Sequence, residues 1–470
     1  MEKNEVCTSE SVDGSRDVWS SRSSDSSSAD HLVVMVNGIL GSATDWKFAA
    51  EQFVQELPEE VFVHCSERNV SKLTLDGVDV MGERLAEEVR EVVRRKPNMR
   101  KISFVAHSVG GLVARYAIGK LYRPPEREDN GDKQRKEDSA GKLCGLEAIN
   151  FITVATPHLG SRGNKQVPFL FGVIAFEKLA SCVIHWIFRR TGQHLFLVDD
   201  DGGKPPLLKR MVEDCDGCYF MYVCCNLVSV SFDLSSYLLD DFFFTLCRSA
   251  LRAFKRRVVY SNVGYDRILY NCSLSLSLSL SLSLSLSLSH THTHTHTHTH
   301  THTHTHTTHT KEPLYFVFPY KGLFSLIKVL DIVGWRTSSI RRDSELPKVL
   351  PGMPFVLLSG STDPLLLCSD SNIYLQWEES LNEKYPHVVY EEHCKALDAN
   401  QYESAEDNGS DKIEEELVTG LSRVSWEKVD VSFHSSRQRF AAHSVIQVKD
   451  RSSHIEGADV IQHMIDHFLT

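Results

Sequence analysis

The feature that most constrains the fold is an alternation of short apolar runs with segments of helical periodicity. The apolar runs are residues 31–36 and 61–65, and the helical segments are residues 49–57 and 81–96. In the second helical segment Leu85, Val89, Val92 and Val93 have the spacing of a helix with one buried face. Strands this apolar, alternating with helices, predict an α/β fold whose mostly parallel sheet is covered on both faces.

The next strand and helix enclose a serine motif. Residues 102–105 are expected to form a strand and residues 111–121 a helix, with AHSVGG between them. Ala106, Ser108 and Gly110 then match the nucleophile elbow, in which a strained serine needs small neighbours because other backbones crowd it. A short match of this kind also describes ordinary buried serines, but the strand before it and the helix after it favour the elbow.

Several motifs together carry a family resemblance. They are VNGILG, FVAHSVGGLVARY, NFITVATPHLGSRG, HLFLVDDDGGKPPLLKRM, RRVVYSNVGYD and AAHSVIQVK. As a set they resemble the putative serine esterase family of lipase-like α/β-hydrolases, and their sequences are similar to those of its plant members. The resemblance runs from about residue 32 to the C-terminus, apart from three segments described below. It implies an α/β-hydrolase fold with a helical, lid-like insertion.

Membership of that family implies a catalytic triad in the order Ser, Asp, His. Ser108 is then the nucleophile. Asp266 follows a strand-like run and would emerge at the carboxyl edge of the sheet, although it could instead be a turn aspartate. His443 lies beyond the acid and just before an apolar run expected to be a strand, and we favour it over His434 and His454, which lie in polar stretches.

The triad also requires donors for a negatively charged oxygen. The backbone N–H of Val109, directly after the nucleophile, is one expected donor. The second is expected from Ile39 or Leu40 in the NGILG turn. Similar enzymes often have His-Gly at the start of this turn, whereas this chain has Asn37-Gly38; because the donor is a backbone N–H, this difference leaves the role open to Ile39 or Leu40.

A repeat of Ser-Leu followed by His-Thr begins at Ser273. In an extended chain the His-Thr alternation would put all imidazoles on one face, where they could bind zinc, copper or nickel. The same letters are, however, the translation of two adjoining dinucleotide microsatellites. We therefore expect no metal site there, and no cofactor anywhere in the chain.

Three segments, residues 222–248, 267–331 and 349–376, look unlike the rest of the sequence. Each can begin with GT and end with AG in some reading frame, and its removal restores a plausible junction. We interpret them as retained introns. The expected organisation is a disordered Ser-rich tail at residues 1–30 and one hydrolase domain at residues 31–470, interrupted by these segments.

Composition limits the expected partners, the redox state of the cysteines and the cellular location of the protein. A net charge of −11 gives no electrostatic reason to bind nucleic acid. Twelve cysteines without a second C-x-x-C pair fit reduced thiols better than a zinc site or a disulfide framework. The N-terminus has no apolar run typical of a signal peptide, and charged residues interrupt the apolar stretch at residues 167–190. We expect a cytoplasmic protein, with peripheral membrane contact as a further option.

The predicted activity is hydrolysis of acyl esters. The resemblance implies lipid substrates such as acylglycerols or phospholipids, and the apolar residues 167–188 could be a lid or, equally, a buried core helix. Two other functions stay open: transfer of the acyl group to an alcohol, and a catalytically inactive lipid-binding protein if the unspliced chain, which keeps the three segments, is the real product.

Overall fold

The computed structural model describes residues 6–20, 29–124, 141–161, 188–212, 249–264, 333–347, 382–397 and 411–470. The chain divides into two units, residues 1–267 with 331–470, and residues 268–330. Every described residue belongs to the first unit. The three segments interpreted as retained introns, residues 167–187 of the expected lid and Asp266 all lie outside the described residues.

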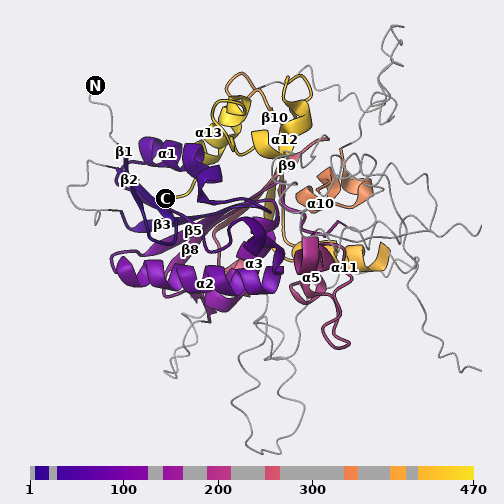
Figure 1. Cartoon of the computed structure of the whole chain (residues 1–470). Coiled ribbons are helices and arrows are strands. Elements are labelled where there is room, and N and C mark those ends of the chain that lie inside the picture. Colours follow the sequence, from indigo (N-terminus) through magenta and orange to yellow (C-terminus); the bar gives the residue numbers. More distant parts are fainter. Residues whose placement is uncertain are drawn as a thin grey trace, which may run out of the picture. The chain divides into compact units, whose positions relative to one another are not determined.

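The described residues form a sheet of nine strands in the order β1-β2-β4-β3-β5-β8-β9-β11-β10 (Figure 1). Its strands are β1 (Val6–Glu10), β2 (Arg16–Ser20), β3 (His31–Val36), β4 (Val61–Cys65), β5 (Lys101–His107), β8 (Glu147–Val154), β9 (Arg256–Asn262), β10 (Val388–Cys394) and β11 (Trp426–Val431). The six strands from β4 to β11 run parallel, and the pairs at both ends of the sheet are antiparallel. A short ribbon of β6 (Tyr122–Arg123) and β7 (Lys142–Leu143) stands apart.

Helices cover both faces of this sheet. In Figure 1, α1 and α13 lie on one face and α2 and α3 on the other. The helices are α1 (Lys47–Glu56), α2 (Val78–Arg95), α3 (Val109–Leu121), α5 (Leu207–Arg210), α7 (Ser249–Arg252), α10 (Trp335–Ser339), α11 (Asp411–Leu421), α12 (Ala442–Val445) and α13 (Ala458–Asp466). Shorter 3₁₀ turns are η1 (Ala43–Trp46), η2 (Ser71–Leu75), η5 (Asp343–Glu345), η7 (Arg439–Ala441) and η8 (Ile455–Gly457).

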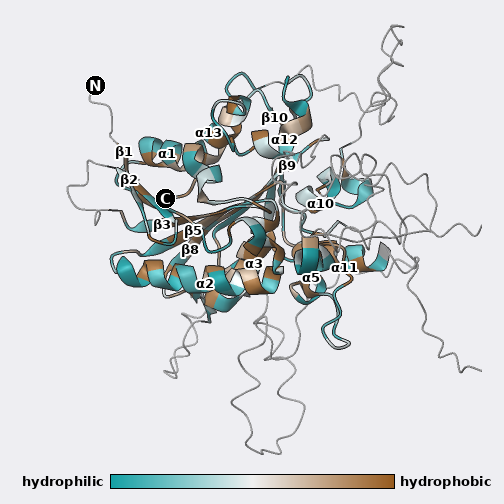
Figure 2. Ribbon diagram, viewed as in Figure 1, coloured by the Kyte–Doolittle hydropathy of each residue, from teal (hydrophilic) through white to brown (hydrophobic). Residues whose placement is uncertain are grey.

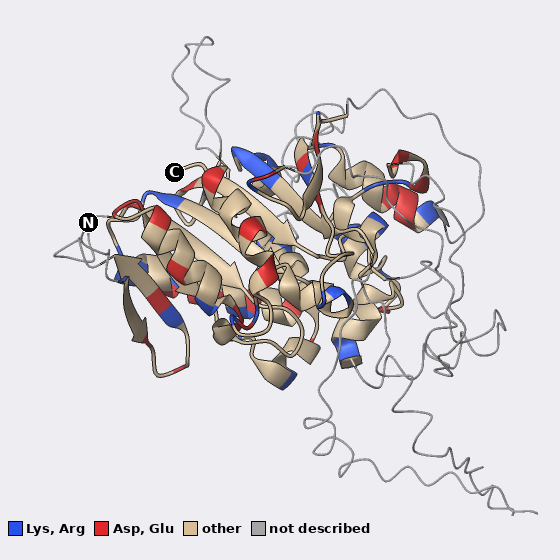
Figure 3. Cartoon of the chain, turned by 90° about the horizontal axis from the view of Figure 1, so that it is seen from above, with Lys and Arg blue, Asp and Glu red and all other residues tan. Residues whose placement is uncertain are grey.

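The pattern of burial explains this architecture. All residues of β3, β4 and β9 are buried, as expected for strands with helices on both sides. Figure 2 shows the strands mostly brown and α2 alternating between teal and brown around its axis. In Figure 3 the middle strands are mostly tan, while many of the red and blue residues lie on helices. The predicted α/β-hydrolase fold, a mostly parallel sheet between helices, is confirmed.

The expected disordered tail at residues 1–30 is wrong for residues 6–20. These form the hairpin β1–β2, and β2 adds to β4 in antiparallel register from Arg16 with Cys65 to Val18 with Val63. Val18 is fully buried in the main core cluster. The prediction failed because the serine-rich composition suggests disorder, whereas β2 buries Asp17, Val18 and Ser20 against the rest of the fold.

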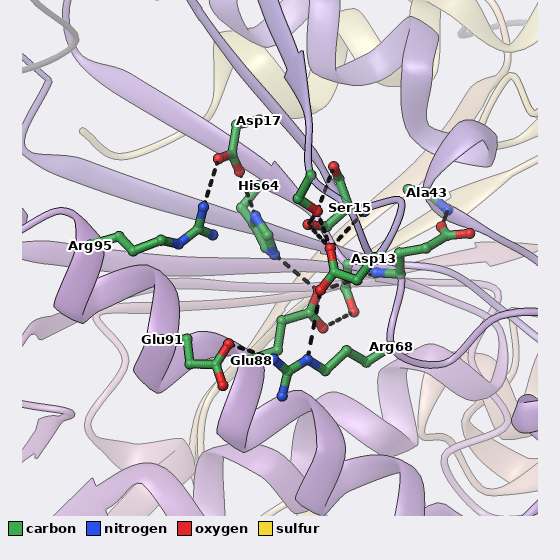
Figure 4. A network of polar contacts seen from close by, with 12 residues as sticks. Asp13, Ser15, Asp17, Ala43, His64, Arg68, Glu88, Glu91 and Arg95 are labelled. Carbon is green, nitrogen blue, oxygen red and sulfur yellow. Dashed lines mark hydrogen bonds and ion pairs between the residues drawn. The ribbon is translucent and has the colours of Figure 1, made fainter.

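A buried charged network ties this hairpin to the sheet and to α2 (Figure 4). His64 on β4 donates from Nδ1 to Asp17 on β2 at 2.6 Å and from Nε2 to Glu88 on α2 at 3.1 Å. Ser66 Oγ also donates to Glu88, at 2.6 Å, and the Arg95 guanidinium lies 3.6 Å from Asp17. The imidazole therefore joins three elements that are separate in sequence.

The carboxylates of Asp17 and Glu88 both favour the protonated form of His64. Burial opposes protonation of the ring, but the hydrogen bonds to Asp17 and Glu88 outweigh it and raise the pKa of His64 to about 9. The protonated imidazole is thus the form that the folded protein stabilises around neutral pH.

We expect this network to make folding stability depend on pH. Because the folded pKa of His64 lies above the ordinary value of 6.5, its contribution is complete below about pH 6.5 and is lost as the pH rises through about 9. Urea unfolding at pH 6, 7, 8 and 9 should show the free energy of unfolding falling over this range. His64→Gln should remove that part of the slope, and parallel slopes for the two proteins would contradict the assignment.

Candidate active site

The serine motif forms a strained turn between β5 and α3. Ser108 has φ 55° and ψ −135°, a backbone conformation that residues other than glycine rarely adopt. Its N–H donates to the Val154 carbonyl at 2.8 Å, and its own carbonyl accepts from the Gly111 N–H at 3.0 Å and the Thr156 hydroxyl at 2.9 Å. These bonds hold the strained strand–turn–helix geometry that the motif predicts, while the role of Ser108 as nucleophile stays a prediction.

The glycine of the motif is required by close backbone contact. A Cβ at Gly110 would lie 2.4 Å from the Asn37 carbonyl oxygen and 2.8 Å from the Val36 carbonyl oxygen. On the other side of the same contact, a Cβ at Gly38 would lie 2.8 Å from the Ser108 Cβ. The turn after β3 therefore packs directly against the serine, as a source of oxyanion donors must.

The two candidate donors in this turn, the N–H groups of Leu40 and Ile39, differ in their hydrogen bonding. The Leu40 N–H donates to the Thr74 hydroxyl at 2.8 Å, with Leu40 at φ 53°. The Ile39 N–H has no acceptor among the described residues. Val109 begins α3, and the first N–H groups of a helix have no acceptor within it. Ile39 and Val109 are thus better placed than Leu40 to donate to a substrate.

His443 lies in the short helix α12 and is 5% exposed. The expectation that it precedes a strand is wrong, because the apolar residues that follow pack as a helical turn into the main core cluster. The His443 carbonyl accepts from His107 Nε2 at 2.7 Å, and the two imidazole centroids are 4.5 Å apart. His107 directly precedes Ser108, so the structure brings the predicted base to the elbow.

A second contact anchors the segment that carries His443. Lys449 Nζ lies 3.1 Å from Asp45 Oδ2, in the 3₁₀ turn that follows the NGILG loop. The base segment is therefore connected both to the elbow and to the loop of the expected oxyanion donors. Ser108 Oγ is buried and makes no hydrogen bond to a described residue, so the predicted bond between the nucleophile and His443 is not formed in this structure.

The competing histidines have other surroundings. The His454 ring accepts from the Asp450 N–H at 3.2 Å in an exposed turn. The His434 N–H donates to Ser432 Oγ at 3.4 Å, and burial lowers the pKa of its ring. His443, in contrast, contacts His107, the residue directly before Ser108, through both its backbone carbonyl and its ring.

The acid of the triad stays a prediction. β9 ends at Asn262, and Asp266 lies just beyond the last described residue of that segment, Gly264. The neighbouring strand β11 carries a buried carboxylate, Asp430, at a similar height in the sheet. Sequence reasoning did not single it out.

Asp430 is engaged elsewhere. Its two oxygens lie 2.9 and 2.8 Å from Arg341 Nη1, and Oδ1 also accepts from Trp335 Nε1 at 2.8 Å. Both partners belong to residues 333–347, and Arg341 is fully buried. This ion pair fixes α10 and its flanking residues to β11, and it leaves Asp430 poorly suited to orient a histidine.

A strained serine at the carboxyl edge of a mostly parallel sheet, with a histidine delivered from the chain after the last parallel strand, defines the α/β-hydrolase class. The family described as "Putative serine esterase (DUF676)" matches residues 26–275 of the 470. The chain belongs to this family.

Relatives from two yeasts carry the name lipase. "Putative lipase ROG1" of Saccharomyces cerevisiae is 30% identical over 255 residues, 52% of this chain and 28% of the relative. "Putative lipase C4A8.10" of Schizosaccharomyces pombe is 28% identical over 175 residues, 36% of this chain and 19% of the relative. The chain thus spans less than a third of the length of these curated relatives. The likeness to plant members stays a prediction.

Among solved structures, the chain is similar to Bacillus licheniformis lipase BlEst2. The crystal structure of its propeptide form has 15% identity and a TM-score of 0.28, covering 51% of this chain and 37% of that one. The mature form has 19% identity and a TM-score of 0.23, covering 37% of this chain and 56% of that one.

Two further properties concern the described residues alone. None of their helices combines the length and the apolar character that a membrane crossing would need. Nor do three or more of their His, Cys, Asp or Glu side chains gather so that a metal ion could be held. The histidines of the repeat lie outside the described residues.

We expect Gly110→Ala to damage the elbow. The added methyl would meet two backbone oxygens that cannot move without displacing β3, so the free energy of unfolding should fall by about 1–3 kcal/mol or more. Gly203→Ala is the matched control, since Gly203 has φ +79° but nothing within 4 Å of the added carbon. It should lose only about 1 kcal/mol from backbone strain. Equal losses in urea unfolding would argue against the steric explanation.

Proposed function

We propose that this protein is a serine hydrolase that cleaves acyl esters with Ser108 as nucleophile, His443 as general base and Asp266 as the carboxylate that orients the base. The observation that carries the proposal is the Ser108 backbone, held at φ 55° by bonds to the strand beside it. An ordinary buried serine has no need of this strain, whereas a nucleophile needs its hydroxyl raised above the edge of the sheet.

The chemistry follows from the weakness of a neutral hydroxyl as a nucleophile. A neutral imidazole at His443 takes the Ser108 proton as Oγ attacks the ester carbonyl carbon. The tetrahedral intermediate then collapses, the alcohol leaves with the proton from the imidazolium, and an acyl-serine remains. Water, deprotonated by the same imidazole, attacks the acyl carbon; this second intermediate collapses, Ser108 Oγ takes the proton from the imidazolium, and the acid is released. Asp266 stabilises the imidazolium without accepting its proton.

The negative oxygen of each intermediate needs donors that are already in place. The proposal assigns this role to the N–H groups of Val109 and Ile39, since the Leu40 N–H already donates to Thr74. The steric contact between Gly38 and Ser108 keeps the two donors close to the reacting carbon. Each such donor contributes about 3 kcal/mol to stabilising the transition state.

The proposed substrates are esters of hydrophobic acyl chains, such as acylglycerols or phospholipids. Support comes from the names of the yeast relatives and from the apolar residues 167–188, which precede the described helical residues 188–195. Peripheral contact with membranes is part of this proposal. Adding glycerol or a lysolipid to the assay separates hydrolysis from acyl transfer, because a transferase would form a new ester in place of the free acid.

We expect Ser108→Ala to lower kcat for a neutral acyl ester by about 10⁴-fold or more, because no neighbouring group can replace the nucleophile. Asp266→Asn should lose somewhat less, since the oxyanion donors remain, and the double variant should be little worse than Ser108→Ala. The parent in these comparisons is the chain without residues 222–248, 267–331 and 349–376, and a fluorophosphonate should label Ser108 covalently in this parent only. Near-normal hydrolysis by Ser108→Ala, free of contaminating esterase, would mean that the nucleophile lies elsewhere; absence of hydrolysis and labelling in the parent would favour an inactive lipid-binding protein.

The proposal includes the three atypical segments. We infer that residues 222–248, 267–331 and 349–376 are intron translations and that the shorter chain is the competent enzyme. The sheet supports this: β9 precedes the longest segment and β11 follows it, yet they pair in parallel register from Val258 with Glu427 to Asn262 with Val431. The short helix α10, after that segment, packs on β9.

We therefore expect transcripts that lack all three segments, with the junctions CYFM-SALRAF, GYD-H-IVGW and ELPK-WEESL. Amplification across the region in RNA tests this. The shorter protein should turn over the ester at least about 10²-fold faster than the 470-residue chain, since the longest segment begins directly after Asp266 and small displacements of catalytic groups are costly. Dominant full-length transcripts, or equal activity of the two proteins, would contradict the interpretation.

A further inference from the structure

His107, between β5 and the nucleophile, has a place in the site that the triad does not use. It is 4% exposed and is the variable residue of the motif AHSVG. Its Nε2 lies 2.7 Å from the carbonyl oxygen of His443, a residue 336 positions away. Its Nδ1 would be 3.1 Å from a Cβ built on Gly38. One imidazole thus lies against the elbow, the base segment and the loop of the proposed oxyanion donors.

The partner of Nε2 fixes the tautomer of His107. A backbone carbonyl can only accept, so Nε2 must carry the hydrogen. In the neutral ring Nδ1 then has no hydrogen. The bond therefore has one direction, from the side chain next to the nucleophile to the backbone of the base.

The surroundings of His107 keep its ring neutral. Burial lowers the pKa of His107 well below its ordinary value, and the nearby His443 and Lys449 lower it further, against the raising effect of the bond to the His443 carbonyl. Of the charged groups near the segment, Lys449 is paired with Asp45. During the proposed reaction His443 becomes an imidazolium, and a second cation at a ring distance of 4.5 Å would oppose that step.

The base segment needs such a support. β11 ends at Val431, and His443 follows only after a stretch of turns, in a helix of four residues. This contrasts with Ser108, which a strand and a thirteen-residue helix hold on either side. The bond from His107 is a direct link between these two unequally supported parts of the site.

We propose that His107 is a positioning residue, which holds the His443 backbone by its Nε2 hydrogen bond so that the imidazole of the base stays within reach of Ser108. The inference rests on the proposed function, because it assumes His443 as base. His107 itself touches neither substrate nor reacting atoms in this scheme. Its contribution is to kcat, through the geometry of the base, and not to the binding of the ester.

The test compares two replacements of His107 in both the 470-residue and the shorter chain. His107→Gln keeps an N–H donor near the position of Nε2, whereas His107→Leu keeps bulk and removes the donor. We expect His107→Leu to lower kcat by about 10²-fold with KM changed by less than about twofold, and His107→Gln to recover most of kcat. Equal kcat values for the two variants would overturn the proposal.

A matched control separates positioning from general stability. His31 is also a buried histidine on a central strand, and its Nε2 is hydrogen-bonded to Ser103 Oγ at 2.7 Å. It is the first residue of β3, however, and so lies at the edge of the sheet opposite Ser108. His31→Leu should lower the temperature of unfolding at least as much as His107→Leu while leaving kcat within about threefold of the parent. A loss of kcat that follows the loss of stability in both variants would contradict positioning.

The His443→Ala background distinguishes failure of this inference from failure of the proposed function. If His107 acts through His443, His107→Leu should cause no further loss of kcat once His443 is absent. A further loss of tenfold or more would show that His107 acts independently, and the inference would be wrong while the triad stands. Unchanged activity of His443→Ala in otherwise active protein would instead reject His443 as the base.

Discussion

The close approach of two turns governs the site: the loop leaving β3 lies against the elbow that leaves β5. Gly110 faces the carbonyls of Val36 and Asn37, and Gly38 faces the Ser108 Cβ. Neither contact leaves space for a side chain. The register of β3 with β5, which pairs Val36 with Ala106, sets this distance, so the parallel pairing in the middle of the sheet determines the geometry of the proposed oxyanion site.

Around this fixed centre, the parts of the site differ in how they are supported. Ser108 and Val109 are held by regular secondary structure and backbone hydrogen bonds. The short segment of His443 is contacted by two side-chain interactions, the bond from His107 to the His443 carbonyl and the ion pair of Lys449 with Asp45. The ion pair of Arg341 with Asp430 fixes another non-regular segment to the sheet. Side-chain contacts therefore attach these non-regular segments to the sheet, whereas strand pairing holds Ser108.

How much the sequence could predict depended on the range of the interactions. The strands at residues 31–36, 61–65 and 102–105, the helix at residues 81–96 and the strained turn at Ser108 follow from local periodicity and short-range steric demands, and the structure contains all of them. The contact of His107 with His443 spans 336 positions, and no local pattern marks it. The β1–β2 hairpin was missed because its stability comes from pairing with β4 and from His64, both distant in sequence. Asp266 stays a prediction.

The strand order has a consequence for the synthesis of the chain. One partner of β9, β8, precedes it in the chain, but its other partner, β11, is synthesised only after residues 263–425. Until then β9 is an open edge of apolar side chains and unpaired backbone groups, the kind of edge that recruits other chains. Every residue inserted between the two strands lengthens the time for which this edge of β9 lacks its partner during synthesis.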